Sequence, residues 1–175
     1  PMTADDLRDM MSIAQEYDGP ISIRYPRGRT IECPYPFTTK VELGKGVCLA
    51  KGEKVAVLSI GAIGNTVAQA IEMATDRSQD SADIFAHYDM RWLKPLDKNI
   101  LKDIAEKFDT IITIEDGVIT GGLGSAVLEW INDHAYRTRV IRLGVDDQFV
   151  EHGSTKELYH LLKLDKEGIC ESLLQ

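Results

Sequence analysis

The sequence has few cysteines, no long apolar run and no excess of positive charge, and each of these absences removes a class of protein. Its three cysteines, Cys33, Cys48 and Cys170, are far apart and form no Cys-x-x-Cys pair, which argues against a disulfide framework and a zinc knuckle. No run of about 18 apolar residues is present, so no membrane partner is expected. The first residues, 1–6, lack the basic start and apolar core of a signal peptide. We therefore expect a cytoplasmic protein with reduced thiols.

The charge balance narrows the partners further. Twenty Lys and Arg residues stand against 28 Asp and Glu residues, a formal net charge of −8, and a protein that binds a phosphate backbone normally carries a basic face. Nucleic acid is therefore not an expected partner. A small phosphorylated ligand still fits, because it needs only one or two cations. With 43% apolar residues among 175, the chain is long enough for one folded domain, or for one domain and part of another.

The first 42 residues differ from the rest of the chain. Thr3 and Asp6 have the spacing of a capping box and predict a helix, which Gly19-Pro20 ends before a predicted short strand at 21–23. From residue 25 to about 39 the chain contains three prolines and no clear period, which predicts an extended connector. This connector is the best candidate for a domain boundary.

Beyond the connector, strand-like and helix-like segments alternate. Residues 46–50 and 55–60 are predicted to be two strands that form a hairpin through the turn at 51–53. Further strands are predicted at 82–87, 110–114 and 139–143, with helices between them and two more near the end, the first capped by Ser154-Thr155-Lys156-Glu157. This alternation predicts an α/β fold with a mostly parallel, Rossmann-like sheet and helices on both faces.

Two glycine-containing corners and one acidic segment are candidate sites. Gly121-Gly122-Leu123-Gly124 precedes a helix and could hold a phosphate, but Val127 breaks the dinucleotide fingerprint, and tight packing explains the glycines as well. In the corner at 61–66, Asn65 or Thr66 is expected to cap a helix. Glu115-Asp116-Gly117 follows the predicted strand at 110–114. Its carboxylates could bind a metal or transfer protons, or could cap the next element.

An arginine-rich corner is the most suggestive feature. In Tyr25-Pro26-Arg27-Gly28 the proline fixes the direction of Arg27, whose planar guanidinium suits a phosphate monoester. An interdomain salt bridge is the alternative, and Arg24 and Arg29 lie nearby in the sequence.

The histidines offer no metal site by their spacing. His87, His134, His152 and His160 are isolated from one another, and His87 with Asp89 does not make a triad. His152, in a loop before a capped helix, is the histidine best placed to reach a partner.

Taken together, these segments resemble one enzyme family. They are Arg24-Tyr25-Pro26-Arg27-Gly28, Gly44-Lys45-Gly46, Leu58-Ser59-Ile60-Gly61, Lys94-Pro95-Leu96-Asp97, Glu115-Asp116-Gly117-Val118-Ile119, Gly121 to Val127, and Glu151-His152-Gly153. In order and spacing they resemble the C-terminal third of the 1-deoxy-D-xylulose-5-phosphate synthases, in the transketolase superfamily. The β-subunits of 2-oxoacid dehydrogenases share the glycine loop and the Pro-Leu-Asp turn, but the Tyr-Pro-Arg-Gly corner favours the synthases.

The resemblance implies a homodimeric transferase that joins pyruvate to glyceraldehyde 3-phosphate with loss of CO₂, using thiamine diphosphate and Mg²⁺. Residues 1–24 would be the tail of the central, pyrimidine-binding domain. Residues 25–42 would be an extended linker, and residues 43–175 the transketolase-type C-terminal domain. By the same resemblance, Arg27 would contact the phosphate of glyceraldehyde 3-phosphate.

Other parts that the family needs are not found in this sequence. The diphosphate and metal site requires Gly-Asp-Gly followed further on by Asn, and Glu115-Asp116-Gly117 does not match that motif. We therefore expect no catalytic, cofactor-binding or metal-binding residue here, no thiamine diphosphate bound to this chain alone, and no turnover by it. A freestanding assembly or binding module with the same fold is the alternative hypothesis.

Overall fold

A computed structural model describes residues 1–28, 33–35, 40–78 and 84–175. Its helices and strands follow one another in this order: α1 (Ala4–Glu16), β1 (Val47–Ala50), β2 (Val55–Ile60), α2 (Ile63–Arg77), β3 (Phe85–Asp89), α3 (Lys98–Lys107), β4 (Thr110–Val118), α4 (Leu123–Asp133), β5 (Arg139–Val145), α5 (Thr155–Leu161) and α6 (Lys166–Leu173). No helix in these ranges is long and apolar enough to cross a membrane.

The strands form one five-stranded sheet in the order β1-β3-β2-β4-β5. Strand β2 pairs in parallel with β3 and β4, and β4 pairs in parallel with β5. Only the edge strand β1 runs antiparallel, against β3. The predicted α/β class with a mostly parallel sheet is therefore confirmed.

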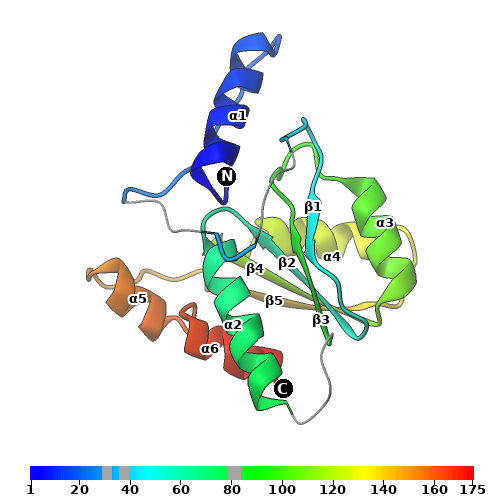
Figure 1. The fold of residues 1–175 in the computed structure, drawn as a ribbon, viewed down its shortest axis with the longest axis vertical. Coiled ribbons are helices and arrows are strands. Elements are labelled where there is room, and N and C mark those ends of the chain that lie inside the picture. The colour runs from blue at the N-terminus through cyan, green and yellow to red at the C-terminus, as the bar shows by residue number, and fades with distance from the viewer. Residues whose placement is uncertain (29–32, 36–39, 79–83) are drawn as a thin grey trace.

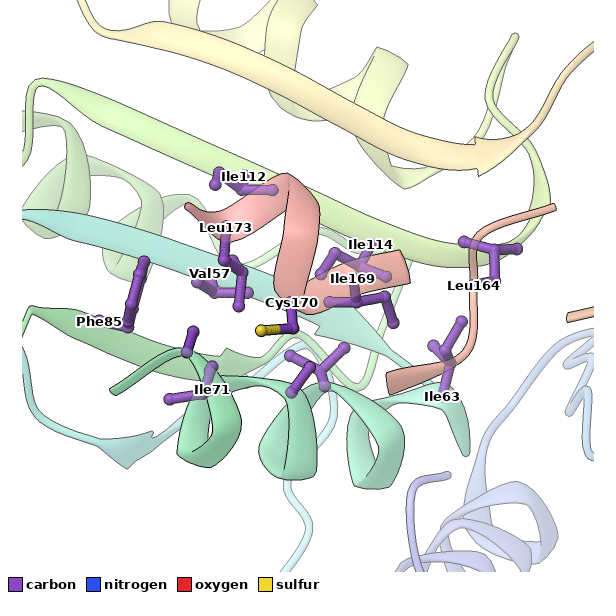
Figure 2. Close-up of a cluster of buried hydrophobic side chains, with 13 residues drawn as sticks. Val57, Ile63, Ile71, Phe85, Ile112, Ile114, Leu164, Ile169, Cys170 and Leu173 are labelled. Carbon is purple, nitrogen blue, oxygen red and sulfur yellow. The ribbon is translucent and has the colours of Figure 1, made fainter. Parts of the chain in front are cut away.

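Helices cover both faces of this sheet (Figure 1). Because side chains alternate along a strand, Val57, Ile112 and Ile114 face a core formed with α2 and α6, which includes Ile169 and Cys170 (Figure 2). Their strand neighbours Ala56, Leu58 and Ile111 face the opposite core, formed with α3 and α4. This two-sided burial explains why β2 and β4 are nearly continuous apolar runs.

The predicted hairpin is wrong. Residues 46–50 and 55–60 do contain strands, but β1 pairs with β3 and not with β2. Both edges of β2 are taken by parallel partners, and β1 pairs instead with the outer edge of β3. The turn between them lies close to β3, since a side chain at Gly52 would overlap the backbone of Phe85 and Ala86.

The predicted strand at 21–23 is also wrong, because this segment has no strand partner among the described residues. Ile21 and Ile23 pack instead against a small separate cluster of Met10, Val41 and Trp92. The alternation in the sequence therefore reports a half-buried extended segment that lies beside α1.

Several predicted boundaries need adjustment. The strand predicted at 82–87 begins in residues that the structure does not describe, and β3 runs from Phe85 to Asp89. Strand β4 continues to Val118, so the acidic pair lies within a strand and not after it. The capping residues Thr3 and Ser154 are confirmed as parts of capping boxes.

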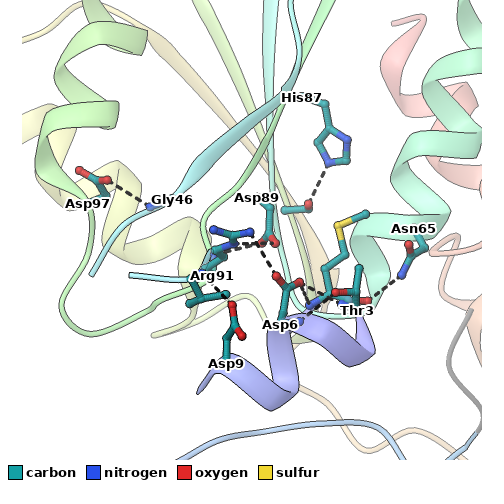
Figure 3. Close-up of polar contacts among 12 residues, drawn as sticks. Thr3, Asp6, Asp9, Gly46, Asn65, His87, Asp89, Arg91 and Asp97 are labelled. Carbon is teal, nitrogen blue, oxygen red and sulfur yellow. Dashed lines mark hydrogen bonds and ion pairs between the residues drawn. The ribbon is translucent and has the colours of Figure 1, made fainter. Parts of the chain in front are cut away.

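Asn65 and Thr66 do not cap α2, whose N-cap is Ala62 without a side-chain bond. The amide of Asn65 instead donates to the carbonyl oxygens of Met2, at 3.0 Å, and Ala62, at 3.2 Å. The first contact ties the start of the chain to the start of α2 (Figure 3).

Candidate functional site

A cavity of about 480 Å³ lies at the carboxyl ends of β2 and β4. On one side it is lined by Ile60 and Gly61 after β2 and by Glu115 and Asp116 of β4; on the other it is lined by residues 20–24 and residues 91–95. The helices that follow β2 and β4 cover opposite faces of the sheet, so the cavity lies where the winding direction changes. Open α/β sheets place ligand-binding loops at this position.

The Glu115 side chain caps the N-terminus of α4. Its two carboxylate oxygens accept the backbone N–H groups of Leu123 and Gly124, each at 2.9 Å, and its side chain is buried. The N-cap residue Gly122 has no side chain to do this. The free N–H groups and positive end of the helix are therefore matched by a carboxylate of the same chain.

This contact decides between the two interpretations of the glycine loop. A side chain at Gly122 would overlap Glu115, and a Cβ at Gly124 would lie 2.7 Å from the Thr113 hydroxyl. The glycines allow the helix to approach β4 closely and leave the anion position to Glu115. Packing, and not a phosphate, accounts for this loop, and the capping interpretation of Glu115 is confirmed.

The neighbouring acid, Asp116, has a different environment. The Tyr159 hydroxyl, in α5, donates to Asp116 Oδ2 at 2.8 Å. Burial raises the pKa of Tyr159, and the bond to Asp116 raises it further, whereas the charge of Arg24 lowers it. Arg24 therefore lies near this pair, and its Nη1 is 3.2 Å from the position that a Cβ on Gly117 would take.

Arg27, the predicted phosphate ligand, is exposed in the segment that follows. Arg24 lines the cavity, but Arg27 does not. It forms no ion pair with any residue in the described ranges. Its neighbour Arg29 lies outside the described residues.

A buried ionic cluster holds α1 against the end of β3 (Figure 3). The Arg91 guanidinium donates to Asp6 Oδ1 at 3.1 Å, and its Nε lies 3.9 Å from Asp89 Oδ2. The second oxygen of Asp6 accepts the backbone N–H groups of Met2 and Thr3 at the start of α1. Burial raises the pKa of Asp89 to about 6 against the opposing effect of Arg91.

A second buried polar cluster surrounds His87. Ser59 Oγ lies 2.9 Å from its Nε2, and the Tyr35 hydroxyl lies 3.0 Å from its Nδ1. Ser59 and His87 have the geometry of a nucleophile and its base, but both are fully buried. Burial lowers the pKa of His87 to about 3, so the ring is neutral near pH 7, and it bridges Ser59 of β2 and Tyr35.

The other three histidines, His134, His152 and His160, lie outside these two clusters. His134 stacks on Trp130, His160 lies 2.7 Å from an Asp165 oxygen, and His152 is exposed in its loop. No group of three or more His, Cys, Asp or Glu residues in the described ranges could hold a metal ion.

Comparison with known proteins agrees with this fold. Residues 44–169 match the family model described as "Transketolase, C-terminal domain". The chain belongs to this family. Among solved structures, it superimposes on one described as a split gene transketolase, inactive beta4 tetramer, with a TM-score of 0.82 and 29% identity, over 99% of this chain and 55% of the other. A transketolase mutant from Pichia stipitis shares the fold with a TM-score of 0.53 and 13% identity, over 74% of this chain and 17% of its own.

Curated relatives cover the remaining residues as well. Proteins named 1-deoxy-D-xylulose-5-phosphate synthase are 48% identical over 97% of this chain in Bacteroides fragilis and 44% identical over 99% in Phocaeicola vulgatus. One from Caldanaerobacter subterraneus is 38% identical over the whole chain. The chain spans only 26 to 28% of the length of these relatives.

Four members of these clusters are not found from the sequence: Tyr159, Ser59, Tyr35 and Arg91. Their partners are Asp116, His87, His87 and Asp6, which lie 43, 28, 52 and 85 positions away in the sequence. A hydroxyl on a half-buried helix next to a strand-end acid carries no local signal.

We expect Glu115→Gln to destabilise the chain by about 1–2 kcal/mol, because the amide offers one acceptor where two N–H groups need one each. Urea unfolding measures this. The control is Glu129→Gln on the exposed face of the same helix, which should change stability by less than about 0.5 kcal/mol. Equal stabilities for the two variants would contradict the capping role.

We expect His87 and Asp89 to give opposite pH dependences. Because the pKa of His87 falls to about 3 in the fold, its contribution is present above about 6.5 and is lost on acidification, by up to about 1.4 kcal/mol per pH unit. The raised pKa of Asp89 makes the folded state hold its proton more tightly, so acidification from pH 6 to 4 favours folding.

Urea unfolding of the two variants between pH 4 and 7 separates these contributions. His87→Asn should flatten the loss of stability on acidification, and Asp89→Asn should steepen it. Parallel curves for the variants and the parent chain would refute both assignments.

Proposed function

We propose that the chain is the C-terminal part of a 1-deoxy-D-xylulose-5-phosphate synthase, a transferase that condenses pyruvate with glyceraldehyde 3-phosphate and releases CO₂. The observation that carries this proposal is the extent of the similarity to the relatives of that name. It covers 97 to 100% of the chain and therefore includes most or all of residues 1–43, which lie outside the transketolase C-terminal domain match. Those residues hold the arginine corner.

The proposed domain organisation separates the residues before the family match from those within it. We assign residues 1–24 to the tail of the central, pyrimidine-binding domain, residues 25–42 to a linker, and residues 43–175 to the C-terminal domain. The family match begins at residue 44, which supports the second boundary. The first boundary is supported by the change in composition at residue 25, where the proline-containing segment begins. The cluster of Met10, Val41 and Trp92 with Ile21 and Ile23 packs all three segments together.

Arg27 is our candidate for the contact with the substrate phosphate. Its side chain is exposed, and Pro26 fixes the backbone before it. The alternative, a salt bridge to another part of this chain, has no partner among the described residues. A planar guanidinium without a carboxylate partner is suited to a phosphate monoester.

The residues of this chain do not fit the family's cofactor, thiamine diphosphate with Mg²⁺. Both oxygens of Glu115 are committed to backbone N–H groups, and Asp116 accepts the Tyr159 hydroxyl. The described residues hold no cluster suited to a metal ion. We therefore assign cofactor binding to the rest of the complete protein and propose that this chain alone does not turn over.

We further propose that the complete protein is a cytoplasmic homodimer whose partners are itself and small phosphorylated substrates. The net charge of −8 disfavours nucleic acid, and the three cysteines are free, which fits a reducing compartment. The tetramer named for the split-gene transketolase is a property of that protein.

The first test is the natural gene product and its activity. We expect a polypeptide several times larger than 19.5 kDa that forms 1-deoxy-D-xylulose 5-phosphate from pyruvate and glyceraldehyde 3-phosphate. Intact-mass measurement and a product assay check this. A native product of only 19.5 kDa would support the freestanding module, and a full-length product without this activity would refute the proposed reaction.

In the complete enzyme, Arg27→Ala should remove a charge-assisted hydrogen bond worth about 1.5–3 kcal/mol. The KM for glyceraldehyde 3-phosphate should rise about 10- to 100-fold while the KM for pyruvate stays within a factor of about two. Steady-state kinetics with each substrate varied separately measures both. An unchanged KM for the phosphorylated substrate would refute the role of Arg27.

Calorimetric titration of the 175-residue chain with thiamine diphosphate and Mg²⁺ should give no heat of specific binding. The complete protein, titrated in the same buffer, is the positive control. Micromolar binding to the chain alone would contradict our assignment of the cofactor site to the rest of the protein.

A further inference from the structure

The acidic segment of β4 is not used by the proposed reaction, although it lies beside the arginine corner. Asp116 and Gly117 come near the end of this strand, and Asp116 lines the cavity together with Arg24. The end of β4 therefore lies in the C-terminal domain but lines the same cavity as residues 20–24, which we assign to the central domain.

The geometry at Gly117 shows that Arg24 rests on β4. The Arg24 Nη1 atom lies 3.2 Å from the position of a Cβ on Gly117, so the guanidinium occupies space that almost any other residue would need. The Asp116 carboxylate is the adjacent residue of the same strand, and it is held by the Tyr159 hydroxyl at 2.8 Å. A Cβ on Gly117 would also lie 3.8 Å from Glu115 Oε2, so the Arg24 guanidinium approaches the bare backbone of β4 on the Glu115 side, and its charge reaches Tyr159 as well.

The other side of the segment is held by apolar contacts. Ile21 and Ile23 pack against Met10, Val41 and Trp92, and the intervening Ser22 is exposed, as is Arg24. The extended segment is therefore fixed on both sides, by a small apolar cluster on one and by β4 on the other. Arg24 is the last residue with such contacts before the corner at Tyr25-Pro26-Arg27.

We propose that the bare backbone of β4 at Gly117, beside Glu115, holds the Arg24 guanidinium in place, and that Arg24 acts as a positioning residue that directs Arg27 toward the substrate phosphate. Only two residues separate Arg24 from Arg27, and the ring of Pro26 restricts one of the backbone angles between them. A guanidinium at position 24 that stays against Gly117 therefore limits the directions that Arg27 can take. This inference rests on the proposed function, because it concerns the phosphate contact of that reaction.

The test uses the complete enzyme and the substitution Arg24→Gln. The KM for glyceraldehyde 3-phosphate should rise about 5- to 20-fold, because small misplacements of a binding group are costly. The KM for pyruvate should stay unchanged. Arg24→Lys, which keeps the charge but not the planar group, should give an intermediate value, and Gly117→Ala should raise the same KM by displacing the guanidinium.

Two further measurements separate positioning from a general structural effect. With unphosphorylated glyceraldehyde as the acceptor, Arg24→Gln should leave the KM unchanged. In an Arg27→Ala background, Arg24→Gln should add less than a factor of two, because both changes remove the same contact. The control is Arg137→Gln, an exposed arginine away from the cavity, which should alter none of these constants.

The outcomes distinguish this inference from the function on which it rests. An equal rise in KM for phosphorylated and unphosphorylated acceptors, or effects of Arg24→Gln and Arg27→Ala that multiply, would overturn the positioning role and leave the synthase assignment standing. An inactive full-length parent with native folding would overturn both. An Arg24→Gln enzyme with the parent's KM would overturn the inference alone.

Discussion

One buried guanidinium joins α1 to the end of β3. Arg91 and its two acidic partners are almost fully buried, with side-chain exposures of 2% for Arg91, 3% for Asp6 and 1% for Asp89. Removing such charges from water costs several kcal/mol per ion, so the cluster is worth little to stability unless each group keeps its partners. Once it is formed, however, α1 has only one position relative to β3, and the segment that follows α1 is carried to the mouth of the cavity.

Glu115 and Asp116 are adjacent in β4, but their side chains have different roles. Because side chains alternate along a strand, Glu115 points toward α4 and Asp116 points away from it, toward α5. The Glu115 carboxylate accepts hydrogen bonds from the N-terminus of α4 and therefore has a structural role. The other is held by a single hydroxyl from a distant helix and faces the cavity. Of these two adjacent residues, Glu115 therefore caps a helix, and Asp116 lines the cavity.

The sequence predicted the parts of this structure that depend on local periodicity. The helix with the Thr3 cap, the buried strand at 110–114 and the alternation of strands and helices are readable because each element buries one face or both at its own period. Pairing is different. The apolar runs at 46–50 and 55–60 are good strands, but the choice of partner is made by β3 and β4, which occupy both edges of β2. The segment at 21–23 shows the same limit, since alternation reports burial and says nothing about hydrogen-bond partners.

In the candidate site, too, local features can be predicted from the sequence and contacts between distant residues cannot. Pro26 and Arg27 are adjacent, so a direction for the guanidinium could be argued from the sequence, whereas Arg24 and Tyr159 meet only through the fold. The Ser59 and His87 pair shows the converse, because its spacing is that of a nucleophile and its base but both side chains are fully buried, away from the cavity. The family domain itself is shared with transketolases, and the arginine corner lies before residue 44, where the family match begins. Under the proposed function, Arg27 in the linker contacts the phosphate of the acceptor, and the C-terminal domain contributes through Gly117, which lies against Arg24 three residues earlier.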